Sequence, residues 1–293
     1  MIDTSVLFDY SFITVAVGTI ILALASSMVG TISVLTKQSL IGDTIGHASY
    51  PGVIFAFILF QQRDPLILTL GAMFSGYVSY YLVHWITRHS EHSLINALAL
   101  VSSSFFGLGM VLKNFIQGHK AFSKAAQAGL QKYLFGQAAF IQQDDVILIS
   151  IVSIFCIVIF LLFYEKYKIF LFDPTFAQLN GISPKLLNQL TTFMMISLIS
   201  VGLKVVGAIL MSSFLIAPAV TGILCSKHYK TALWIGLVSA TISAFLGTYF
   251  SSIISGLSTG PAIIVCMSII ALTTFFITQY IKPNLHKGGS TTC

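Results

Sequence analysis

The sequence alternates between long apolar runs and short polar stretches. A run of about 20 apolar residues can cross the hydrocarbon core of a bilayer as a helix. The pattern predicts nine membrane-spanning helices, at residues Ser11–Thr36, Ile45–Phe60, Pro65–Thr87, Leu94–Leu112, Val146–Tyr164, Leu187–Val201, Val205–Cys225, Ala232–Ser255 and Gly260–Tyr280.

The sixth and seventh of these helices form one nearly continuous apolar run that is too long for a single crossing. Lys204 and Gly207 lie in its middle, so we place a break there. Without the break the helices would number eight. The expected fold is all-α, a polytopic integral membrane protein with eight or nine transmembrane helices. No polar linker divides the chain, so residues 1–293 are expected to form one transmembrane domain.

Composition supports a membrane location. Charged residues make up 8% of the chain and hydrophobic residues 56%, whereas soluble domains carry about 25% charged residues. Such a chain cannot cover a water-facing surface. The net charge of +6 comes from lysines and arginines scattered between apolar runs. That distribution is typical of membrane loops and does not indicate a nucleic-acid partner.

The placement of basic residues predicts the orientation, because cytoplasmic loops are enriched in Lys and Arg. With nine spans and an external N-terminus, the inner loops hold Lys37, Arg88, Lys166, Lys168, Lys185, Lys227, Lys230, Lys282 and Lys287. The outer loops hold fewer basic residues, namely Arg63, Lys113, Lys120, Lys124 and Lys132. The bias favours this orientation, although the long external loop at about residues 113–143 holds four lysines.

Asp43 and His47 stand at the start of the second predicted helix. They are four residues apart, so on a helix they share one face, one turn apart. Pro51 follows four residues later and has no N–H to offer the His47 carbonyl. Ionisable residues in a membrane segment are functional-site candidates by default, and a divalent cation suits one carboxylate and one neutral imidazole. The alternative is an Asp–His hydrogen bond that only ends a helix at the membrane surface.

The loop at about residues 165–186 predicts a short helix on the cytoplasmic face. Asp173 is a suitable N-cap with Pro174 at the first helical position, and Gly181 can close the helix two turns later. Ser183 can then cap the next span. A short surface helix suits docking to a soluble partner, but a simple helical connector would explain the pattern equally well.

Two later prolines are kink or gating candidates, together with Pro51. Pro218 lies within an apolar run and predicts a kink. Ser258 or Thr259 followed by Pro261 is typical of a helix start. Small residues surround Pro218, so close helix packing is the alternative role for that region.

Several catalytic patterns are absent from the sequence. It contains no G-x-x-x-x-G-K-[ST] motif, so the chain does not itself hold ATP through a P-loop. It contains no H-E-x-x-H motif. The four cysteines form no C-x-x-C pair. These absences favour translocation over catalysis.

Three stretches occur in the order typical of one transporter family. They are Gly42–Gly52 (GDTIGHASYPG), Phe172–Gly181 (FDPTFAQLNG) and Leu215–Ala219 (LIAPA), and the later Ser258–Pro261 (STGP) also fits. Together they resemble the membrane permease subunits of ATP-binding-cassette (ABC) importers for manganese, zinc and iron, the metal-chelate class. The resemblance covers nearly the whole chain.

The resemblance implies the ABC importer permease fold in a bacterial plasma (inner) membrane. Two such subunits, identical or a related pair, would surround a central path. A separate cytoplasmic subunit would use ATP and dock on a coupling helix that contains Asp173, Pro174, Ala177 and Gly181. An extracellular solute-binding lipoprotein would deliver the metal. The remaining contacts would be with membrane lipids.

The resemblance also implies that Asp43 and His47 face the path and meet the metal. Doubled across a two-fold axis, they give a mixed oxygen and nitrogen set that suits manganese, iron or zinc. A high-affinity structural zinc site would more often recruit cysteine, and none is nearby. The stretch Tyr133–Phe140 resembles the manganese and iron branch more than the zinc branch. Manganese is therefore the favoured cargo, with zinc or iron as alternatives, and we expect no permanently bound cofactor.

Two other transport classes remain open at this point. A stand-alone secondary transporter or channel would need no coupling helix and would often show repeated halves, which the sequence does not display. A permease for siderophores or cobalamin is a nearer neighbour. It would not need the Asp43–His47 pair, since its cargo is a bulky organic complex.

Overall fold

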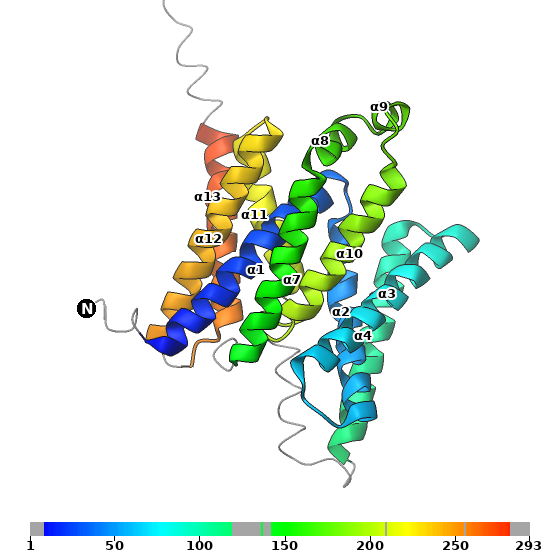
Figure 1. Cartoon of the computed structure of the whole chain (residues 1–293), viewed down its shortest axis with the longest axis vertical. Coiled ribbons are helices and arrows are strands. Elements are labelled where there is room, and N and C mark those ends of the chain that lie inside the picture. The colour runs from blue at the N-terminus through cyan, green and yellow to red at the C-terminus, as the bar shows by residue number, and fades with distance from the viewer. Residues whose placement is uncertain (1–8, 119–135, 137–141, 209, 255, 282–293) are drawn as a thin grey trace, which may run out of the picture.

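The computed structural model describes residues 9–118, 136, 142–208, 210–254 and 256–281. No strand occurs within these ranges, so the all-α prediction is confirmed for them (Figure 1). The elements are α1 (Tyr10–Leu35), α2 (Ser39–Phe60), α3 (Pro65–His89), α4 (Leu94–Gly118), α7 (Gln143–Leu162), α8 (Tyr164–Phe172), α9 (Pro174–Leu179), α10 (Pro184–Gly202), α11 (Met211–Cys225), α12 (Tyr229–Ile253), α13 (Thr259–Phe276) and η3 (Ile277–Ile281).

Seven of the described helices are long and apolar enough to cross a membrane: α1, α2, α3, α4, α7, α12 and α13. A shorter apolar helix, α11, has 15 residues, and α10 has 19. The prediction of eight or nine apolar helices therefore fits the structure.

The break predicted between the sixth and seventh apolar runs is confirmed. Helix α10 ends at Gly202 and α11 begins at Met211. Between them Gly207 has a φ of +93°, a conformation that residues with a side chain rarely adopt. The chain therefore turns back here, at the end of the bundle where α7 begins (Figure 1).

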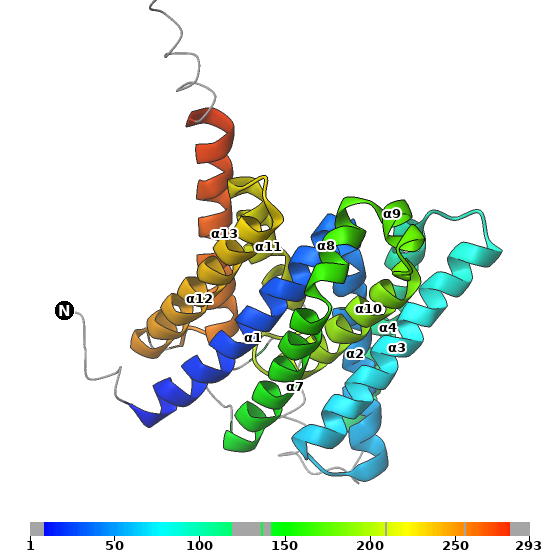
Figure 2. The same ribbon diagram turned by 45° about the horizontal axis from the view of Figure 1, so that its top comes forward.

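The helices form two groups joined by a central pair. One group is α2, α3 and α4, and the other is α1, α11, α12 and α13. Helices α7 and α10 lie between them, since α10 contacts α2 and α3 and both α7 and α10 contact α1 (Figure 2).

Small residues bring α2 close to α3. A Cβ added at Gly52 would lie 2.2 Å from the Gly71 carbonyl oxygen, so only glycine allows this crossing. Nearby, the Ser75 hydroxyl donates to the Ala48 carbonyl at 2.6 Å. Such contacts are typical of tightly packed membrane helices, and they fix the position of α2 relative to α3.

Several boundaries differ from the sequence prediction. Helix α2 begins at Ser39, earlier than the expected Ile45, and α4 continues to Gly118. The external loop therefore starts later than residue 113. The stretch Tyr133–Phe140 lies outside the described residues except for Gly136, and Lys282 and Lys287 also lie outside them.

Candidate functional site

Asp43 and His47 lie on the same face of α2, as their spacing predicts. The distance from His47 Nε2 to the nearer Asp43 oxygen, Oδ1, is 3.8 Å, which is too long for a hydrogen bond. The side chains are 22% (His47) and 43% (Asp43) exposed. Both side chains are therefore accessible, and neither is saturated by the other.

Helix α4 forms the opposite wall of a pocket beside this pair. The pocket has a volume of about 350 Å³. Its lining comes from one face of α2 and one face of α4, with Leu40, Asp43, Thr44, His47, Ile95, Leu98, Ala99, Ser102, Ser103 and Phe106. Within it, the carboxylate and the imidazole face hydroxyl groups and an aromatic ring.

The His47 ring is held by packing rather than by a hydrogen bond. Its Nδ1 atom is buried without a hydrogen-bond partner. The edge-to-face contact with Phe106 has a centroid distance of 5.3 Å and an interplanar angle of 80°. Metal-binding histidines usually donate their second ring N–H to an acceptor, so this imidazole is fixed less firmly than in most permanent metal sites.

The pair does not make a complete metal site within one chain. No group of three or more His, Cys, Asp or Glu residues occurs in the part of the chain that the structure describes. Protein sites for divalent transition metals usually supply at least three ligands. Within the described residues, the pair therefore supplies one oxygen-donor and one nitrogen-donor side chain.

Pro51 lies inside α2, one turn beyond His47. It packs against α4, because a Cβ added at Gly109 would lie 3.3 Å from the Pro51 Cδ and 2.7 Å from the Tyr50 Cδ1. The missing N–H of Pro51 removes the usual helical partner of the His47 carbonyl. The resulting weak point in α2 is next to the candidate ligands.

Helix α9 has the caps that the sequence predicts. Asp173 Oδ1 accepts hydrogen bonds from the backbone N–H groups of Thr175 and Phe176, at 2.8 and 3.0 Å, and Pro174 is the first helical residue. Gly181, with a φ of +73°, closes the helix. Its N–H donates to Gln178 and that of the next residue to Ala177, the paired bonds of a Schellman motif.

Helix α8 is an element that the sequence prediction missed. Tyr167 anchors it: its hydroxyl donates to the Leu187 carbonyl at 3.1 Å and accepts from the Thr191 hydroxyl at 3.1 Å. Burial raises the pKa of Tyr167 to about 12, while the bond from Thr191 lowers it. The phenol therefore stays protonated at neutral pH. The mixture of lysines and aromatic residues in this segment has no clear helical periodicity, which is why it resembles a loop.

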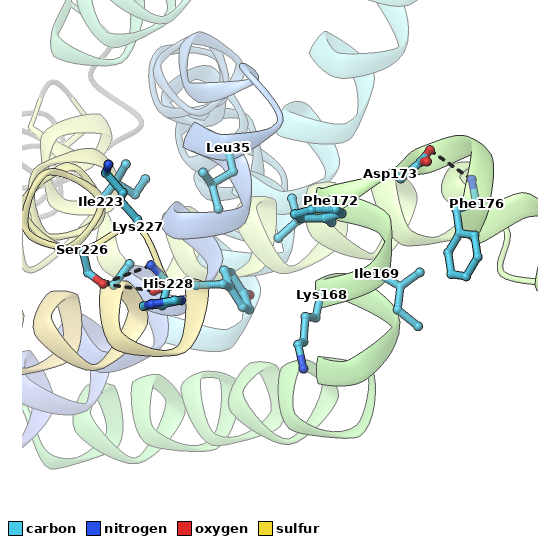
Figure 3. Close-up of a pocket in the computed structure, with 13 residues that line it drawn as sticks. Leu35, Lys168, Ile169, Phe172, Asp173, Phe176, Ile223, Ser226, Lys227 and His228 are labelled. Carbon is cyan, nitrogen blue, oxygen red and sulfur yellow. Dashed lines mark hydrogen bonds between the residues drawn. The ribbon is translucent and has the colours of Figure 1, made fainter.

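Helices α8 and α9 present apolar side chains on a surface outside the spans. Phe172 is 95% exposed, and Leu179 and Phe176 are also exposed. Beside them is a pocket of about 990 Å³ between α8, the end of α1 and the α11–α12 turn (Figure 3). Lys168 and Lys227 line it. A buried Ala177 holds α9 in place beneath this surface.

The two later prolines occupy different positions. Pro218 is buried inside α11, and its carbonyl oxygen would lie 3.1 Å from a Cβ added at Gly236 of α12. Pro261 lies in the first turn of α13, after the cap residue Ser258. It therefore begins a helix as predicted, and α13 is not interrupted by it.

The sequence and fold were compared with known proteins. The profile of the ABC 3 transport family matches residues 9–278. The zinc transport system membrane protein TroC of Treponema pallidum is 35% identical over 92% of this chain and 89% of that protein. The manganese transport system membrane protein MntC of Bacillus subtilis is 34% identical over 88% of this chain and 59% of that protein.

A solved structure also matches the fold. PsaBC from Streptococcus pneumoniae, in complex with Fab, superposes with a TM-score of 0.82 at 23% identity, covering 96% of this chain and 97% of that one. The match supports the arrangement of helices described above.

Proposed function

The chain belongs to the ABC 3 transport family, and we propose that it is the membrane permease of an ATP-driven importer of divalent transition-metal ions, with manganese as the cargo. The observation that carries the proposal is the Asp43–His47 pair, which is accessible beside a pocket between α2 and α4 in a largely apolar helical bundle. Ionisable side chains within membrane segments are energetically unfavourable, and where they occur they usually serve a function.

The geometry of the Asp43–His47 pair supports a paired permease. Two copies of the chain, or this chain and a related one, would bring two Asp43-type carboxylates and two His47-type imidazoles to one axis. Each copy holds its two donors 3.8 Å apart, so an ion between the copies could bind both pairs at once. Ligands shared between subunits can separate when the subunits move, which allows release.

The surface of α8 and α9 supports docking of a separate ATPase. Phe172, Phe176 and Leu179 expose apolar area on helices that are too short to span a membrane. Lys168 and Lys227 add positive charge beside it. We assign the coupling role to α9, with Asp173, Pro174, Ala177 and Gly181 giving it a rigid shape. Pro51 and Pro218 are the proposed points of bending, and Pro261 the proposed fixed start of α13.

Orientation follows from the same end of the molecule. Lys37, Lys168, Lys185 and Lys227 lie in or next to the connections at the α8–α9 end. The enrichment of positive charge supports a cytoplasmic location for this end. The opposite end would receive metal from an extracellular solute-binding lipoprotein.

Manganese is preferred to zinc as cargo on donor chemistry. Carboxylate oxygen suits manganese, whereas thiolate favours zinc, and no cysteine lines the pocket. The relative in Bacillus subtilis is named a manganese transport protein. Zinc is the second candidate, because the relative in Treponema pallidum is named a zinc transport protein and zinc binds a given site more tightly than manganese.

The test is uptake of labelled Mn²⁺ into proteoliposomes that hold this chain with its ATPase and binding protein. We expect uptake that requires ATP and that fails in Asp43→Ala while the complex still assembles. Weak competition by excess Zn²⁺ would indicate that the binding protein selects the cargo, because the site itself would bind zinc more tightly than manganese. Uptake of zinc alone would keep the mechanism and change the cargo. Uptake without ATP would instead support a secondary transporter, and uptake of a metal chelate that is unaffected by Asp43→Ala would support a siderophore-type permease.

A further inference from the structure

A second ionisable pair lies inside the bundle, away from the candidate metal ligands. Lys204 Nζ contacts Asp145 Oδ2 at 2.5 Å. The Asp145 side chain is 4% exposed and that of Lys204 20%. The same Asp145 oxygen accepts the backbone N–H of Gln142 at 2.8 Å. The pair is therefore buried and hydrogen-bonded, and it joins the start of α7 to the turn after α10.

That turn, residues 203–208, is a buried non-helical segment; we call it the crossover turn. Leu203, Val205 and Val206 are fully buried, and Ala208 is almost so. Backbone N–H and C=O groups that are buried outside a regular helix need partners within the protein. The crossover turn must therefore be held in place by its neighbours.

The crossover turn contacts α2 between the two candidate ligands. A Cβ added at Gly46 would lie 2.8 Å from the Ala208 carbonyl oxygen. Gly46 directly precedes His47 and follows Asp43 by three residues. Any shift of the crossover turn toward α2 would therefore displace the helix turn that carries both donors.

The other end of this connection leads to the cytoplasmic surface. Asp145 lies in the first turn of α7, and α7 continues through a single residue into α8, which carries Tyr167 and leads to α9. A helix of 20 residues spans about 30 Å and is stiff on that scale. Movement of α8 and α9 would thus reach Asp145 at the far end of α7.

We infer that the Asp145–Lys204 pair couples α7 to the crossover turn, so that movement imposed on α8 and α9 by the ATPase reaches the Asp43–His47 pair through Gly46. Asp145 and Lys204 are positioning residues: neither contacts the metal. The inference rests on the proposed import function, and it identifies how the α8–α9 surface is connected to the Asp43–His47 pair. The physical reason is that a charge-assisted contact in an apolar interior resists separation, so the two elements it joins move together.

The experiment uses the complete complex, with permease, ATPase and binding protein, in proteoliposomes. Four forms are compared: wild type, Asp145→Ala/Lys204→Ala, Lys204→Arg, and the control Thr19→Val/Thr248→Val. The double variant removes both charges, so no charge is left buried alone. The control removes a buried side-chain contact of 3.3 Å between α1 and α12, and neither of its residues belongs to α2 or to the crossover turn. Metal uptake and ATP hydrolysis are measured on the same samples, together with assembly of the complex.

We expect the double variant to assemble and to hydrolyse ATP within about twofold of wild type, while metal uptake per ATP falls by about tenfold or more, the scale typical of coupling between sites. Lys204→Arg should keep most of the wild-type metal uptake per ATP, because arginine keeps the positive charge beside Asp145. The Thr19 and Thr248 control should leave the ratio unchanged. A purely structural role would lower uptake and hydrolysis together.

Two results would overturn the inference. One is a double variant that assembles and takes up as much metal per ATP as wild type. The other is a control variant in which metal uptake per ATP falls as much as in the double variant. If the double variant does not assemble, Lys204→Met and Asp145→Asn are measured as single variants in its place, and an unchanged ratio in both overturns the inference. Failure of the import function itself is separate, because wild type would then show no ATP-driven metal uptake.

Discussion

The bundle contains two ionisable pairs that differ in almost every physical respect. Asp43 and His47 are 3.8 Å apart, partly exposed and beside a pocket. Asp145 and Lys204 are in direct contact, and the carboxylate is almost fully buried. A pair that binds and releases an ion must keep free coordination positions, whereas a pair that holds two segments together must have none. The difference fits the proposed roles, a cargo site for the first pair and a connection between segments for the second.

The largest expected effect is loss of metal uptake when one candidate ligand is removed. His47→Ala should abolish uptake, exceeding the 10–100-fold typical of residues that only support a metal ligand. Assembly should be unchanged, because His47 is partly exposed and its Nδ1 makes no hydrogen bond. Uptake of labelled Mn²⁺ is the measurement.

The matched control for this variant is His84→Ala. His84 lies within α3, where its Nδ1 pairs with the Tyr80 carbonyl at 3.1 Å and its ring packs against the Tyr80 ring. Uptake should persist. Equal loss in both variants would mean that the bundle tolerates no change at its histidines, and the assignment of His47 would then have no support.

When the buried Asp145–Lys204 pair is broken, the main effect should be a loss of stability of the folded permease. Lys204→Ala leaves the Asp145 carboxylate buried without its cation, which costs about 3–5 kcal/mol in comparable cases. The unfolding temperature in detergent should fall clearly. The same change at Lys168, which forms an exposed pair with Glu165 at 3.7 Å, should have little effect. Similar unfolding temperatures for the two variants would contradict the distinction between buried and exposed pairs.

A smaller effect is expected at the contact that connects the two pairs. Gly46→Ala places a methyl group against the Ala208 carbonyl, and overpacking of this kind costs about 1–3 kcal/mol. Uptake should fall although both metal ligands are intact. Gly107→Ala in α4 is the control, since a Cβ there meets no atom within 4 Å. Unchanged uptake with Gly46→Ala would show that α2 does not need this contact.

The smallest effect is expected at the cap of α9. Asp173→Ala removes the acceptor for the Thr175 and Phe176 amides, and loss of such a cap costs about 1 kcal/mol. Hydrogen exchange of those two amides should accelerate, and stimulation of ATP hydrolysis by the permease should weaken. The control is Asp64→Ala, which removes the corresponding cap of α3 at the Leu66 amide. It should accelerate exchange only locally, without changing ATP hydrolysis.

Features that depend on local sequence were predictable. The apolar runs, the break at Lys204 and Gly207, and the capped helix from Asp173 to Gly181 all follow from composition or from residues a few positions apart. The shared face of Asp43 and His47 follows from helical periodicity. Each of these depends on interactions within one element, so the tertiary arrangement does not alter them.

Features that depend on distant residues were not predictable in the same way. The sequence marks Lys204 as a break but does not indicate its partner, because Asp145 lies 59 residues earlier. Phe106 and Ser102 carry no charge that would single them out among the residues of α4. The close approach of Gly46 to Ala208 depends on how α2 packs against the crossover turn. Only the three-dimensional arrangement reveals these contacts.

The most direct measurement is pulsed electron paramagnetic resonance of the Mn²⁺-loaded complex, with wild type beside His47→Ala. Direct ligation by His47 predicts ¹⁴N couplings to the manganese ion in wild type and fewer or none in the variant, where only the imidazole of a related partner permease could remain. The same nitrogen couplings in both samples would mean that the cargo binds elsewhere, and would contradict the assignment of Asp43 and His47 as its ligands.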